Sequence, residues 1–321
     1  MRATPLLLPL LFSGWLAVPA YADNAQDLLK RLAQAEQQQS FQGAFVYERN
    51  GSFSTHRIWH RVLDGKVRER LLQLDGSAQE IVRVDGLTQC VSGTLVEGLA
   101  NLPDPSGRVL DARKLSAWYD MKVAGTSRVA GRPATILVMS PKDQHRYGIE
   151  LHLDNQTGMA LKSLLLSERG VLLERFQFVD YDSARPIEDK VLQASGDCQP
   201  LQVAKSKPVE KPVVSNAWHT DWLPSGFELT NQSVREEQGS HTRVISQLYG
   251  DGLARFSVFV EPVDGTRSSD IRTQFGPTAV VSRRLGVGQN EAMVTVVGEI
   301  PVGTAERIAL SMRHSDTPAS K

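Results

Sequence analysis

Hydrophobic and polar positions alternate in short runs between residues 41 and 92, and four turn dipeptides separate these runs. The dipeptides are Asn50-Gly51, Asp64-Gly65, Asp75-Gly76 and Asp85-Gly86. Both central residues of a type I′ hairpin turn need positive φ, which Asn-Gly and Asp-Gly tolerate best. The pattern therefore predicts a meander of about five antiparallel strands.

The strands of this meander carry one apolar and one polar face. Between residues 57 and 62, one face holds Ile58, His60 and Val62, and the other holds Arg57, Trp59 and Arg61. A sheet with one apolar face needs a second layer or a ligand over that face. Residues 23–39 are predicted to form a helix that supplies part of this cover, because its apolar positions form one stripe. The stripe consists of Ala25, Leu28, Leu29 and Leu32.

A second series of alternating segments, from residue 125 to residue 179, predicts another meander of about five strands. Residues 110–121 predict a helix between the two meanders. Its side chains Trp118, Tyr119 and Met121 are expected either to join the core or to line a pocket for an apolar ligand. The large domain thus combines about ten strands with one or two helices.

The first 22 residues have the features of a secretory signal peptide. Arg2 precedes an apolar segment, Leu6 to Val18, that is too short to span about 30 Å of hydrocarbon as a helix. Ala20-Tyr21-Ala22 matches an A-x-A cleavage site, so cleavage is expected after Ala22. An uncleaved membrane anchor is the alternative. No later stretch is as apolar as a membrane span, which predicts a soluble, exported protein.

A mature chain of about 300 residues exceeds what one hydrophobic core usually supports, which predicts two domains. We expect a large domain over residues 23–198 and a linker over residues 199–215, where three prolines and three lysines accompany few bulky apolar residues. Residues 216–312 predict a small α+β domain of about four or five strands with a C-terminal helix, 304–312. A disordered tail is expected over residues 313–321. The fold class is therefore β-rich α+β.

Charge and cysteine content narrow the functional classes. Without Arg2 the chain holds 35 basic and 36 acidic residues, a balance that argues against general affinity for nucleic acid. Cys90 and Cys198 are either paired, as an oxidising compartment favours, or two buried thiols. A bridge between them would close a loop of about 100 residues.

No catalytic or metal-binding constellation stands out in the sequence. It contains neither a G-x-S-x-G elbow nor a P-loop or dinucleotide glycine pattern. His56 and His60 lie on one predicted strand about 13 Å apart, at ~3.3 Å per residue, which is too far to share a zinc ion. Asp180 and Asp182 are interpreted as a solvated strand end rather than a cation site. We therefore expect neither enzyme activity nor a bound metal or cofactor.

Motifs in both predicted domains resemble known proteins. The hairpin motif L-x-L-D-x-x-T-G, at residues 151–158, resembles the outer-membrane lipoprotein-carrier fold, in which an incomplete antiparallel barrel surrounds helices and leaves an apolar cavity. Three motifs resemble the C-terminal domain of the RseB/MucB family. They are W-L-P-S-G-F from Trp222, Y-G-D-G-L-A-R-F-S-V-F-V-E from Tyr249, and V-V-G-E-I-P-V-G-T-A from Val296. The likeness extends over the whole mature chain.

This resemblance implies a periplasmic negative regulator of the envelope-stress sigma factor. Such a regulator binds the periplasmic part of a membrane-spanning anti-sigma factor, RseA or MucA, and shields it from proteolysis. Lipopolysaccharide fragments or mislocalised lipoproteins release it, and in some members the output includes alginate synthesis. A periplasmic lipid or lipoprotein carrier is the alternative, which the large domain alone would favour but which leaves the small domain without a role.

Candidate binding residues fall in both predicted domains. Arg272, Arg283 and Arg284 lie in a segment without acidic residues and are candidates for contact with acidic groups of the partner or with lipid phosphates. An ordinary solvated face is the alternative. The candidates for the lining of an acyl-chain cavity, with plain core as the alternative, are Phe45, Trp59, Trp118, Tyr119, Met121 and Met139.

Overall fold

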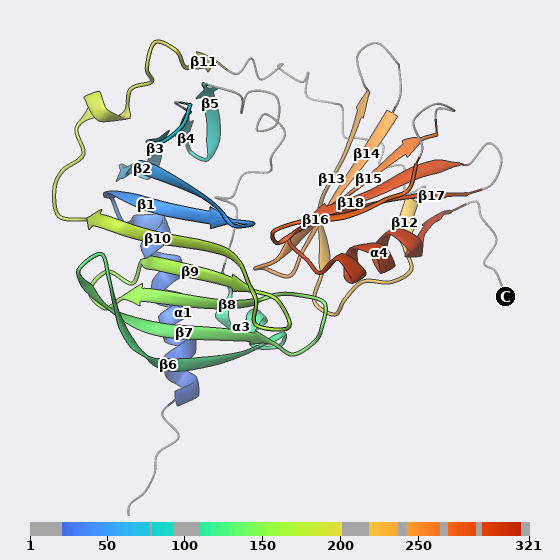
Figure 1. Cartoon of the computed structure of the whole chain (residues 1–321), viewed down its shortest axis with the longest axis horizontal. Coiled ribbons are helices and arrows are strands. Elements are labelled where there is room, and N and C mark those ends of the chain that lie inside the picture. The colour runs from blue at the N-terminus through green and yellow to red at the C-terminus, as the bar shows by residue number, and fades with distance from the viewer. Residues whose placement is uncertain are drawn as a thin grey trace, which may run out of the picture.

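The computed structural model describes residues 21–77, 79–92, 110–200, 218–236, 243–263, 269–286 and 291–315, which form two units, each on its own antiparallel sheet (Figure 1). Most of the expected signal peptide, linker and tail lies outside the described residues, at 1–20, 201–215 and 316–321. None of the helices within the described ranges has the length and apolar character of a membrane span. The predicted fold class, a large half-barrel sheet over helices with a small α+β domain, is confirmed.

The large domain is built on one eleven-stranded sheet. Its strands lie in the order β11-β5-β4-β3-β2-β1-β10-β9-β8-β7-β6, so the sheet does not close into a barrel. The strands are β1 (Phe41–Arg49), β2 (Ser52–Leu63), β3 (Lys66–Gln73), β4 (Glu80–Val84), β5 (Leu87–Val91), β6 (Tyr119–Val129), β7 (Arg132–Pro141), β8 (Gly148–Asp154), β9 (Ala160–Leu166), β10 (Leu172–Asp182) and β11 (Gln199–Pro200). Both predicted meanders are present, and antiparallel pairing of β1 with β10 joins them into one surface.

The hairpin turns follow the predicted chemistry at three of the four dipeptides. Asn50, Asp64 and Asp85 have φ values of 53°, 51° and 49°, and the glycine after each has a φ between 73° and 76°. Two consecutive positive φ values are the mark of a type I′ turn, whose twist matches that of the strands. At the fourth dipeptide only Gly76 has a positive φ, because β3 and β4 are joined by a longer connection.

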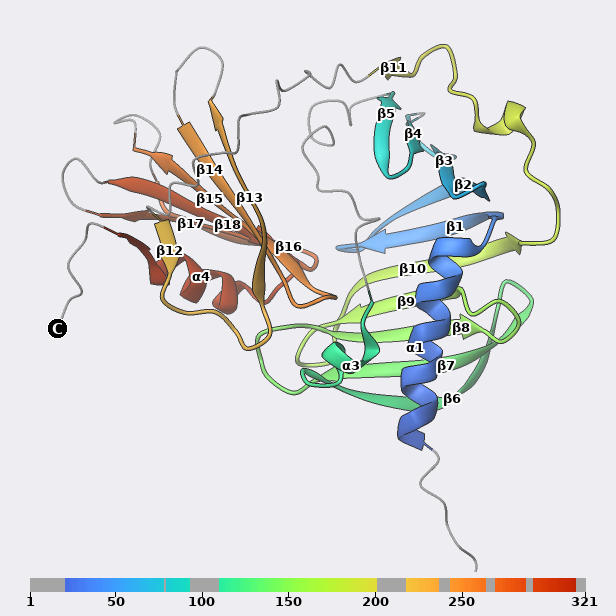
Figure 2. The same cartoon turned by 180° about the vertical axis from the view of Figure 1, so that it is seen from behind.

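Helix α1 (Tyr21–Gln38) lies across strands β10 to β6 and covers the inner face of the large sheet (Figure 2). Its apolar stripe was predicted from the sequence, and all four residues of the stripe are buried. They pack against Leu137, Met139, Leu151 and Leu153 of β7 and β8. Burial of each leucine stabilises the fold by roughly 1.5–3 kcal/mol, so α1 and the sheet hold each other in place.

The helix predicted for residues 110–121 is wrong beyond its first turn. Helix α3 spans only Ala112–Leu115, and the Asp111 side chain caps it by accepting from the backbone N–H groups of Arg113 and Lys114. Strand β6 begins at Tyr119 instead, because Tyr119, Met121 and Val123 alternate with charged residues. This period of two places the apolar side chains on the inner face, which outweighs the helical propensity of the segment.

After β10 the chain returns across the outer face of β2 to β5, opposite α1. The 3-10 helix η3 (Asp189–Leu192) lies there, and Arg61 Nη2 binds Asp189 Oδ1 at 2.6 Å. Beyond it, β11 pairs with β5, and Cys90 and Cys198 form a disulfide beside Val82. Gln199 and Pro200, which were predicted to begin the linker, are therefore part of the large sheet.

Glu80 anchors this return segment from beneath. Its side chain is buried, accepts from Arg70 Nε at 2.6 Å, and also accepts from the backbone N–H and the hydroxyl of Ser195. Burial alone would raise the pKa of Glu80, but the hydrogen bonds from Ser195 and Arg70 outweigh it and lower the pKa below the ordinary value of 4.5. The ionised carboxylate is thus the form that holds the segment.

Glu80→Gln is expected to lower the free energy of unfolding at pH 7 by about 2 kcal/mol, because charge-assisted hydrogen bonds are lost. A depressed pKa contributes stability that is present above the unfolded value of 4.5 and is lost as the pH falls through the lower folded value. The difference in unfolding free energy between wild type and variant should therefore disappear below about pH 4.5. Urea unfolding between pH 3 and pH 7 measures it, with the exposed Glu188→Gln as control, and a gap independent of pH would contradict this role.

The small domain packs a second antiparallel sheet against a C-terminal helix. Its strand order is β13-β14-β15-β18-β17-β16, and β12 and β19 form a separate two-stranded ladder. The strands are β12 (Trp218–Thr220), β13 (Glu228–Glu236), β14 (Arg243–Gly250), β15 (Arg255–Pro262), β16 (Ile271–Phe275), β17 (Thr278–Leu285), β18 (Ala292–Gly298) and β19 (Met312–His314). Helix α4 (Val302–Ser311) buries Ala305, Ile308 and Ala309 against this sheet.

The small domain has more strands than the four or five that were predicted. The four predicted strands correspond to β14, β15, β17 and β18, which carry regular apolar alternation. Strands β13 and β16 were missed because they are the outermost strands of the sheet and carry mostly polar, exposed side chains. Arg313 and His314, predicted to lie in the disordered tail, pair with β12 in β19.

Candidate functional site

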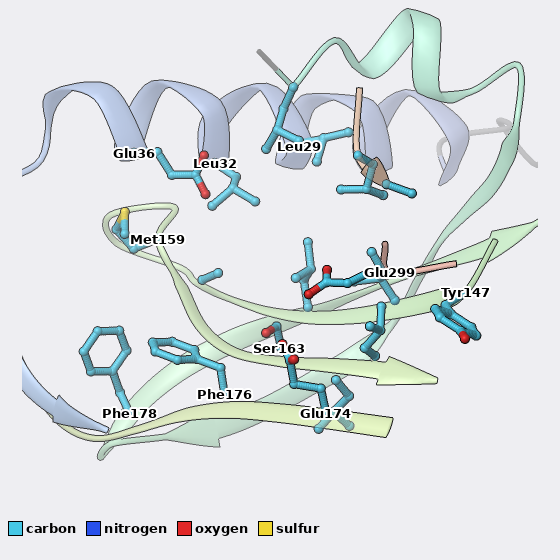
Figure 3. A pocket seen from close by; sticks show the side chains of 18 of the residues that line it. Leu29, Leu32, Glu36, Tyr147, Met159, Ser163, Glu174, Phe176, Phe178 and Glu299 are labelled. Atoms are coloured by element: carbon cyan, nitrogen blue, oxygen red, sulfur yellow. The ribbon is translucent and has the colours of Figure 1, made fainter. Parts of the chain in front are cut away.

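A cavity of about 400 Å³ lies between α1 and the inner face of the large sheet, within the range typical of small-molecule pockets (Figure 3). Apolar side chains from α1, the large sheet and the loop before α3 form most of its wall. They include Leu29, Leu32, Phe41, Ile58, Leu110, Ile149, Leu151, Met159, Phe176 and Phe178. Leu253, Ala254 and Glu299 complete the wall from the small domain, so the cavity spans the domain boundary.

The polar side chains of this cavity are acidic or neutral. Glu36, Glu174 and Glu299 line it together with hydroxyl groups, and none of the described residues that line it is Lys, Arg or His. Glu174 accepts from the Tyr47 hydroxyl at 2.6 Å and binds Arg49 Nε at 3.2 Å. Burial and the adjacent Glu174 carboxylate raise the pKa of Tyr47, which keeps the phenol protonated as the donor.

The structure places only one of the six predicted lining residues, Tyr119, in this cavity. Phe45 and Met139 are buried in the core, Met121 packs against it, and Trp118 lies at the domain boundary. Trp59 is on the outer face, where the Arg70 guanidinium stacks over its ring at 5.3 Å. Four residues that line the cavity were not among the six candidates. Phe176 and Phe178 alternate along β10, and Leu29 and Leu32 belong to the α1 stripe. Both pairs could therefore have been identified from the periodicity of the sequence.

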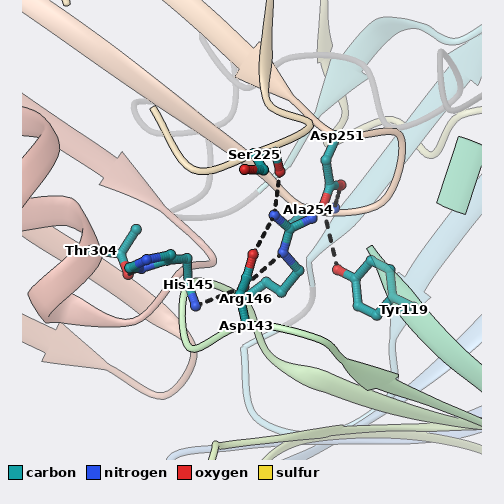
Figure 4. A network of polar contacts seen from close by, with 8 residues as sticks. All are labelled: Tyr119, Asp143, His145, Arg146, Ser225, Asp251, Ala254 and Thr304. Carbon is teal, nitrogen blue, oxygen red and sulfur yellow. Dashed lines mark hydrogen bonds and ion pairs between the residues drawn. The ribbon is translucent and has the colours of Figure 1, made fainter. Parts of the chain in front are cut away.

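Arg146 is a fully buried cation at the boundary between the two domains (Figure 4). It lies between β7 and β8 of the large domain, and its Nη1 binds Oδ2 of Asp251 in the β14–β15 turn of the small domain at 2.6 Å. Its other donors bind Asp143 and the backbone carbonyl of Ser225. The guanidinium also lies 5.0 Å from the Phe227 ring centre. This one side chain therefore bridges the two domains through both charge and packing.

Further contacts extend the boundary on both sides of Arg146. The Tyr147 hydroxyl donates to the Ile300 carbonyl at 3.0 Å and accepts from Gln274 Nε2 at 3.1 Å. Arg49 Nη2 binds Glu299 at 3.0 Å. Gly226 has a φ of +87° and lies directly against the Trp118 indole, where any Cβ would collide. The described parts of the two domains thus meet through a buried, specific interface rather than through the linker alone.

A second cavity, of about 540 Å³, lies at the same boundary beside the first turn of α4. Its lining mixes polar and apolar side chains, and the polar ones include His145, Glu168, Arg272, Thr304 and Arg307. The Arg307 guanidinium stacks over the Trp222 ring at 3.8 Å. His145 shares a hydrogen bond with Thr304, and burial lowers its pKa, so the imidazole is neutral at pH 7.

The three candidate arginines of the small domain are brought together only in part. Arg272 and Arg283 both bind the Glu306 carboxylate of α4, whose pKa these two hydrogen bonds lower. Arg284 lies apart from them and binds Glu291. Arg272 and Arg284 have half-exposed side chains, whereas the Arg283 side chain is only 14% exposed. Of the three, Arg272 alone lines the second cavity.

The cross-domain charges were not singled out from the sequence. Arg146 and Asp251 are 105 residues apart, and each lies in a segment whose sequence is typical of an ordinary polar turn. Periodicity reports which face a side chain takes within one element, and it carries no information on which turns of two domains meet. Within the described residues, no group of three or more His, Cys, Asp or Glu is arranged to hold a metal ion.

Two family models match this chain in succession. The model of the MucB/RseB N-terminal domain matches residues 24–195, and that of the MucB/RseB C-terminal domain matches residues 213–313. The sigma factor AlgU regulatory protein MucB of Pseudomonas aeruginosa is 57% identical over 316 residues, which cover 98% of both chains. The sigma-E factor regulatory protein RseB of Haemophilus influenzae is 30% identical over 323 residues, again 98% of both chains.

Among solved structures, MucB in complex with MucA(peri) is similar to this chain in both sequence and fold. It shows 54% sequence identity and a TM-score of 0.78, and the match covers 91% of this chain and all of that one. The likeness therefore includes both sheets together.

Proposed function

The chain belongs to the MucB/RseB family of regulatory binding proteins, and from this we propose that it binds the periplasmic region of a membrane-spanning anti-sigma factor. The observation that carries the proposal is the match, over both domains, to a protein solved with MucA(peri). Bound in this way, the chain shields the anti-sigma factor from proteolysis and so represses the envelope-stress sigma factor. In MucB-type members of this family the output includes alginate synthesis.

The place of action follows from the same proposal. The partner segment lies in the periplasm, so the chain is exported there with its signal peptide removed after Ala22. The mature protein then consists of the large domain, extended to Pro200 by β11, a linker over 201–215, and the small domain, extended to His314 by β19. The Arg146 interface supports a model in which the partner meets both domains as one surface, because it fixes their relative orientation.

Two parts of the structure support specific roles in this function. The half-exposed Arg272 and Arg284, with Arg283 between them in the chain, offer cations to acidic groups of the partner. The cavity between α1 and the sheet offers a place for an apolar ligand whose arrival releases the partner. The same cavity favours the alternative function, a lipid or lipoprotein carrier, which would not need the small domain.

Calorimetric titration of residues 23–321 against the periplasmic segment of the anti-sigma factor from the same organism tests the function. We expect tight binding that a lipid A-like amphiphile weakens. Retained amphiphile binding without binding to the segment would overturn the regulator and leave a carrier.

Replacing Arg272, Arg283 and Arg284 together by Ala is expected to weaken partner binding by about tenfold, because charge complementarity is lost. The matched control replaces three exposed arginines of the large domain, Arg113, Arg128 and Arg169, and should leave the affinity unchanged. Equal affinities of the two triple variants would remove the candidate arginines from the interface while leaving the function intact.

A further inference from the structure

The cavity between α1 and the large sheet, called here the α1 cavity, adjoins the cavity beside the first turn of α4, called here the α4 cavity. Tyr147 lines both of them. Leu165 in β9 lines the α1 cavity, and Ser167 just beyond β9 lines the α4 cavity. After β18, Glu299 lines the α1 cavity and Pro301 lines the α4 cavity. The two cavities are therefore neighbours, which meet at Tyr147 and at two short segments of the chain.

The wall of the α4 cavity offers both donors and acceptors of hydrogen bonds. Its volume of about 540 Å³ is within the range of small-molecule pockets. Guanidinium and amide groups can donate, and carboxylate, amide and hydroxyl groups can accept. These groups belong to Gln144, Ser167, Glu168, Arg272, Gln274 and Arg307. A sugar carries several hydroxyl groups, each of which can donate and accept, so a sugar suits this wall better than a head group with acceptors alone.

The protein itself holds two guanidinium groups of this wall in place. Arg272 Nε binds Glu306 Oε2 at 2.9 Å, and the Arg307 guanidinium lies 3.8 Å from the centre of the Trp222 ring. A guanidinium has five N–H donors in one plane, so it can also bind two neighbouring oxygen atoms of a ligand. These oxygen atoms can belong to hydroxyl or to phosphate groups, so the site accepts a phosphorylated sugar as well as a neutral one.

We propose that the α4 cavity binds the sugar head group of an amphiphile whose hydrocarbon chain occupies the α1 cavity. The chain leaves water between α1 and the aromatic side chains Phe176 and Phe178, and the head group forms hydrogen bonds beside α4. This inference rests on the proposed function, because it assigns a head-group site to the amphiphile that releases the partner.

Tyr147 lies where the hydrocarbon chain and the head group meet. Its side chain is buried, and its hydroxyl donates to the Ile300 carbonyl and accepts from Gln274 Nε2. Burial raises the pKa of Tyr147, so the phenol stays protonated. A tyrosine offers an apolar ring to a hydrocarbon chain and a polar hydroxyl to a head group. The side chain at this junction therefore matches the change from an apolar to a polar ligand.

Arg272 connects the head group with release of the partner. It lines the α4 cavity from the small domain, whereas Gln144 and Glu168 line it from the large domain. Arg272 is also a candidate for contact with acidic groups of the partner, so ligand and partner compete for one guanidinium. Occupancy of the α4 cavity therefore removes a contact to the partner and adds contacts across the domain boundary.

Calorimetry with two uncharged amphiphiles of equal chain length tests the head-group site. Dodecyl maltoside and dodecyl octaethylene glycol ether, each below its micelle-forming concentration, are titrated into residues 23–321 at pH 7. We expect the maltoside to bind at least about tenfold more tightly, because the ether head group offers mainly acceptors. Equal affinities would overturn the head-group site and leave the α1 cavity standing. Failure of both to bind would overturn the α1 cavity as well, whereas titration of the partner segment alone tests partner binding independently.

Maltose without a hydrocarbon chain distinguishes one joint site from an independent sugar site. We expect maltose to bind at least about a hundredfold more weakly than dodecyl maltoside, because burial of the chain is lost. Maltose that binds as tightly as dodecyl maltoside would contradict a single ligand that spans both cavities.

Gly303→Phe locates the head group, because Gly303 lines the α4 cavity and an added Cβ meets no atom within 4 Å. The filled cavity should lower the affinity for dodecyl maltoside to that for the ether, and the affinity for the ether should not change. Leu310→Phe is the matched control, at an exposed position of the same helix outside the described lining of both cavities, and should change neither affinity. A folded Gly303→Phe protein with wild-type affinity for the maltoside would place the head group elsewhere and contradict the proposal.

Discussion

Replacing Arg146 by Ala is expected to lower the free energy of unfolding by about 3–5 kcal/mol and to separate the two domains. Arg146 and Asp251 have fully buried side chains 2.6 Å apart across the boundary. Without the guanidinium, Asp251 and Asp143 are left as two carboxylates near one another, and the Ser225 carbonyl loses its donor. A buried charge without its partner keeps its desolvation penalty and gains nothing in return.

Urea unfolding and small-angle X-ray scattering together measure this effect. The variant should unfold at lower urea concentration and show a larger radius of gyration, because the domains no longer hold each other. Arg146→Lys keeps the charge but lacks the planar guanidinium group that reaches three partners. Its stability and its radius of gyration should therefore lie between those of the wild type and of Arg146→Ala. The exposed Arg169→Ala is the matched control, with an expected effect within about 0.5 kcal/mol. An Arg146→Ala protein with wild-type stability and scattering would show that the boundary does not depend on this residue.

Removing the disulfide by replacing Cys90 and Cys198 with Ser is expected to destabilise the large domain by about 4–5 kcal/mol. The two cysteines are 108 residues apart, so the cross-link removes much of the conformational freedom of the unfolded chain. In the folded state the effect should concentrate on the return segment, because the described part of β11 pairs with the sheet through two residues, Gln199 and Pro200. Residues 183–200 should then exchange their amide hydrogens faster than the strands beneath them.

Thermal unfolding with and without dithiothreitol provides the control for this prediction. The reductant should lower the melting temperature of the wild-type protein to that of the double Ser variant and should not affect the variant itself. The prediction would be wrong if the double Ser variant had the melting temperature of the oxidised wild type and the same amide hydrogen exchange rates over residues 183–200. Glu80 and η3 would then hold the segment without the cross-link.

Much of the fold could be predicted because its strongest signals are local. A two-residue turn and an alternating strand are decided within about ten residues, and Asn50-Gly51 and Asp64-Gly65 fix both the place and the type of their hairpins. The helical stripe of α1 is equally local. Residues 116–121 were assigned to a helix because Leu115, Trp118 and Tyr119 also fit a spacing of three to four.

The candidate sites depend on contacts that no short window contains. Glu299 reaches the cavity only because the small domain docks against the large one. Trp118 lies at the domain boundary because its ring packs against Gly226 of the small domain. The segment that holds the candidate arginines contains no acidic residue, as the sequence analysis stated. Glu306, which binds two of these arginines, lies outside that segment, on helix α4. When two residues are far apart in the sequence, the sequence pattern does not show that they form an ion pair or that an aromatic side chain lines a particular cavity.

Pairing of β1 with β10 also determines when the large domain can fold. The Tyr47–Glu174 hydrogen bond joins residues 127 positions apart, and Phe45 faces Phe178 in the same ladder. During synthesis from the N-terminus, the β1 edge of the first meander stays unpaired until β10 has been made. Contacts of such long range slow folding and leave transient surfaces open to aggregation. The first five strands are thus the part of this protein that most needs a chaperone before the second meander arrives.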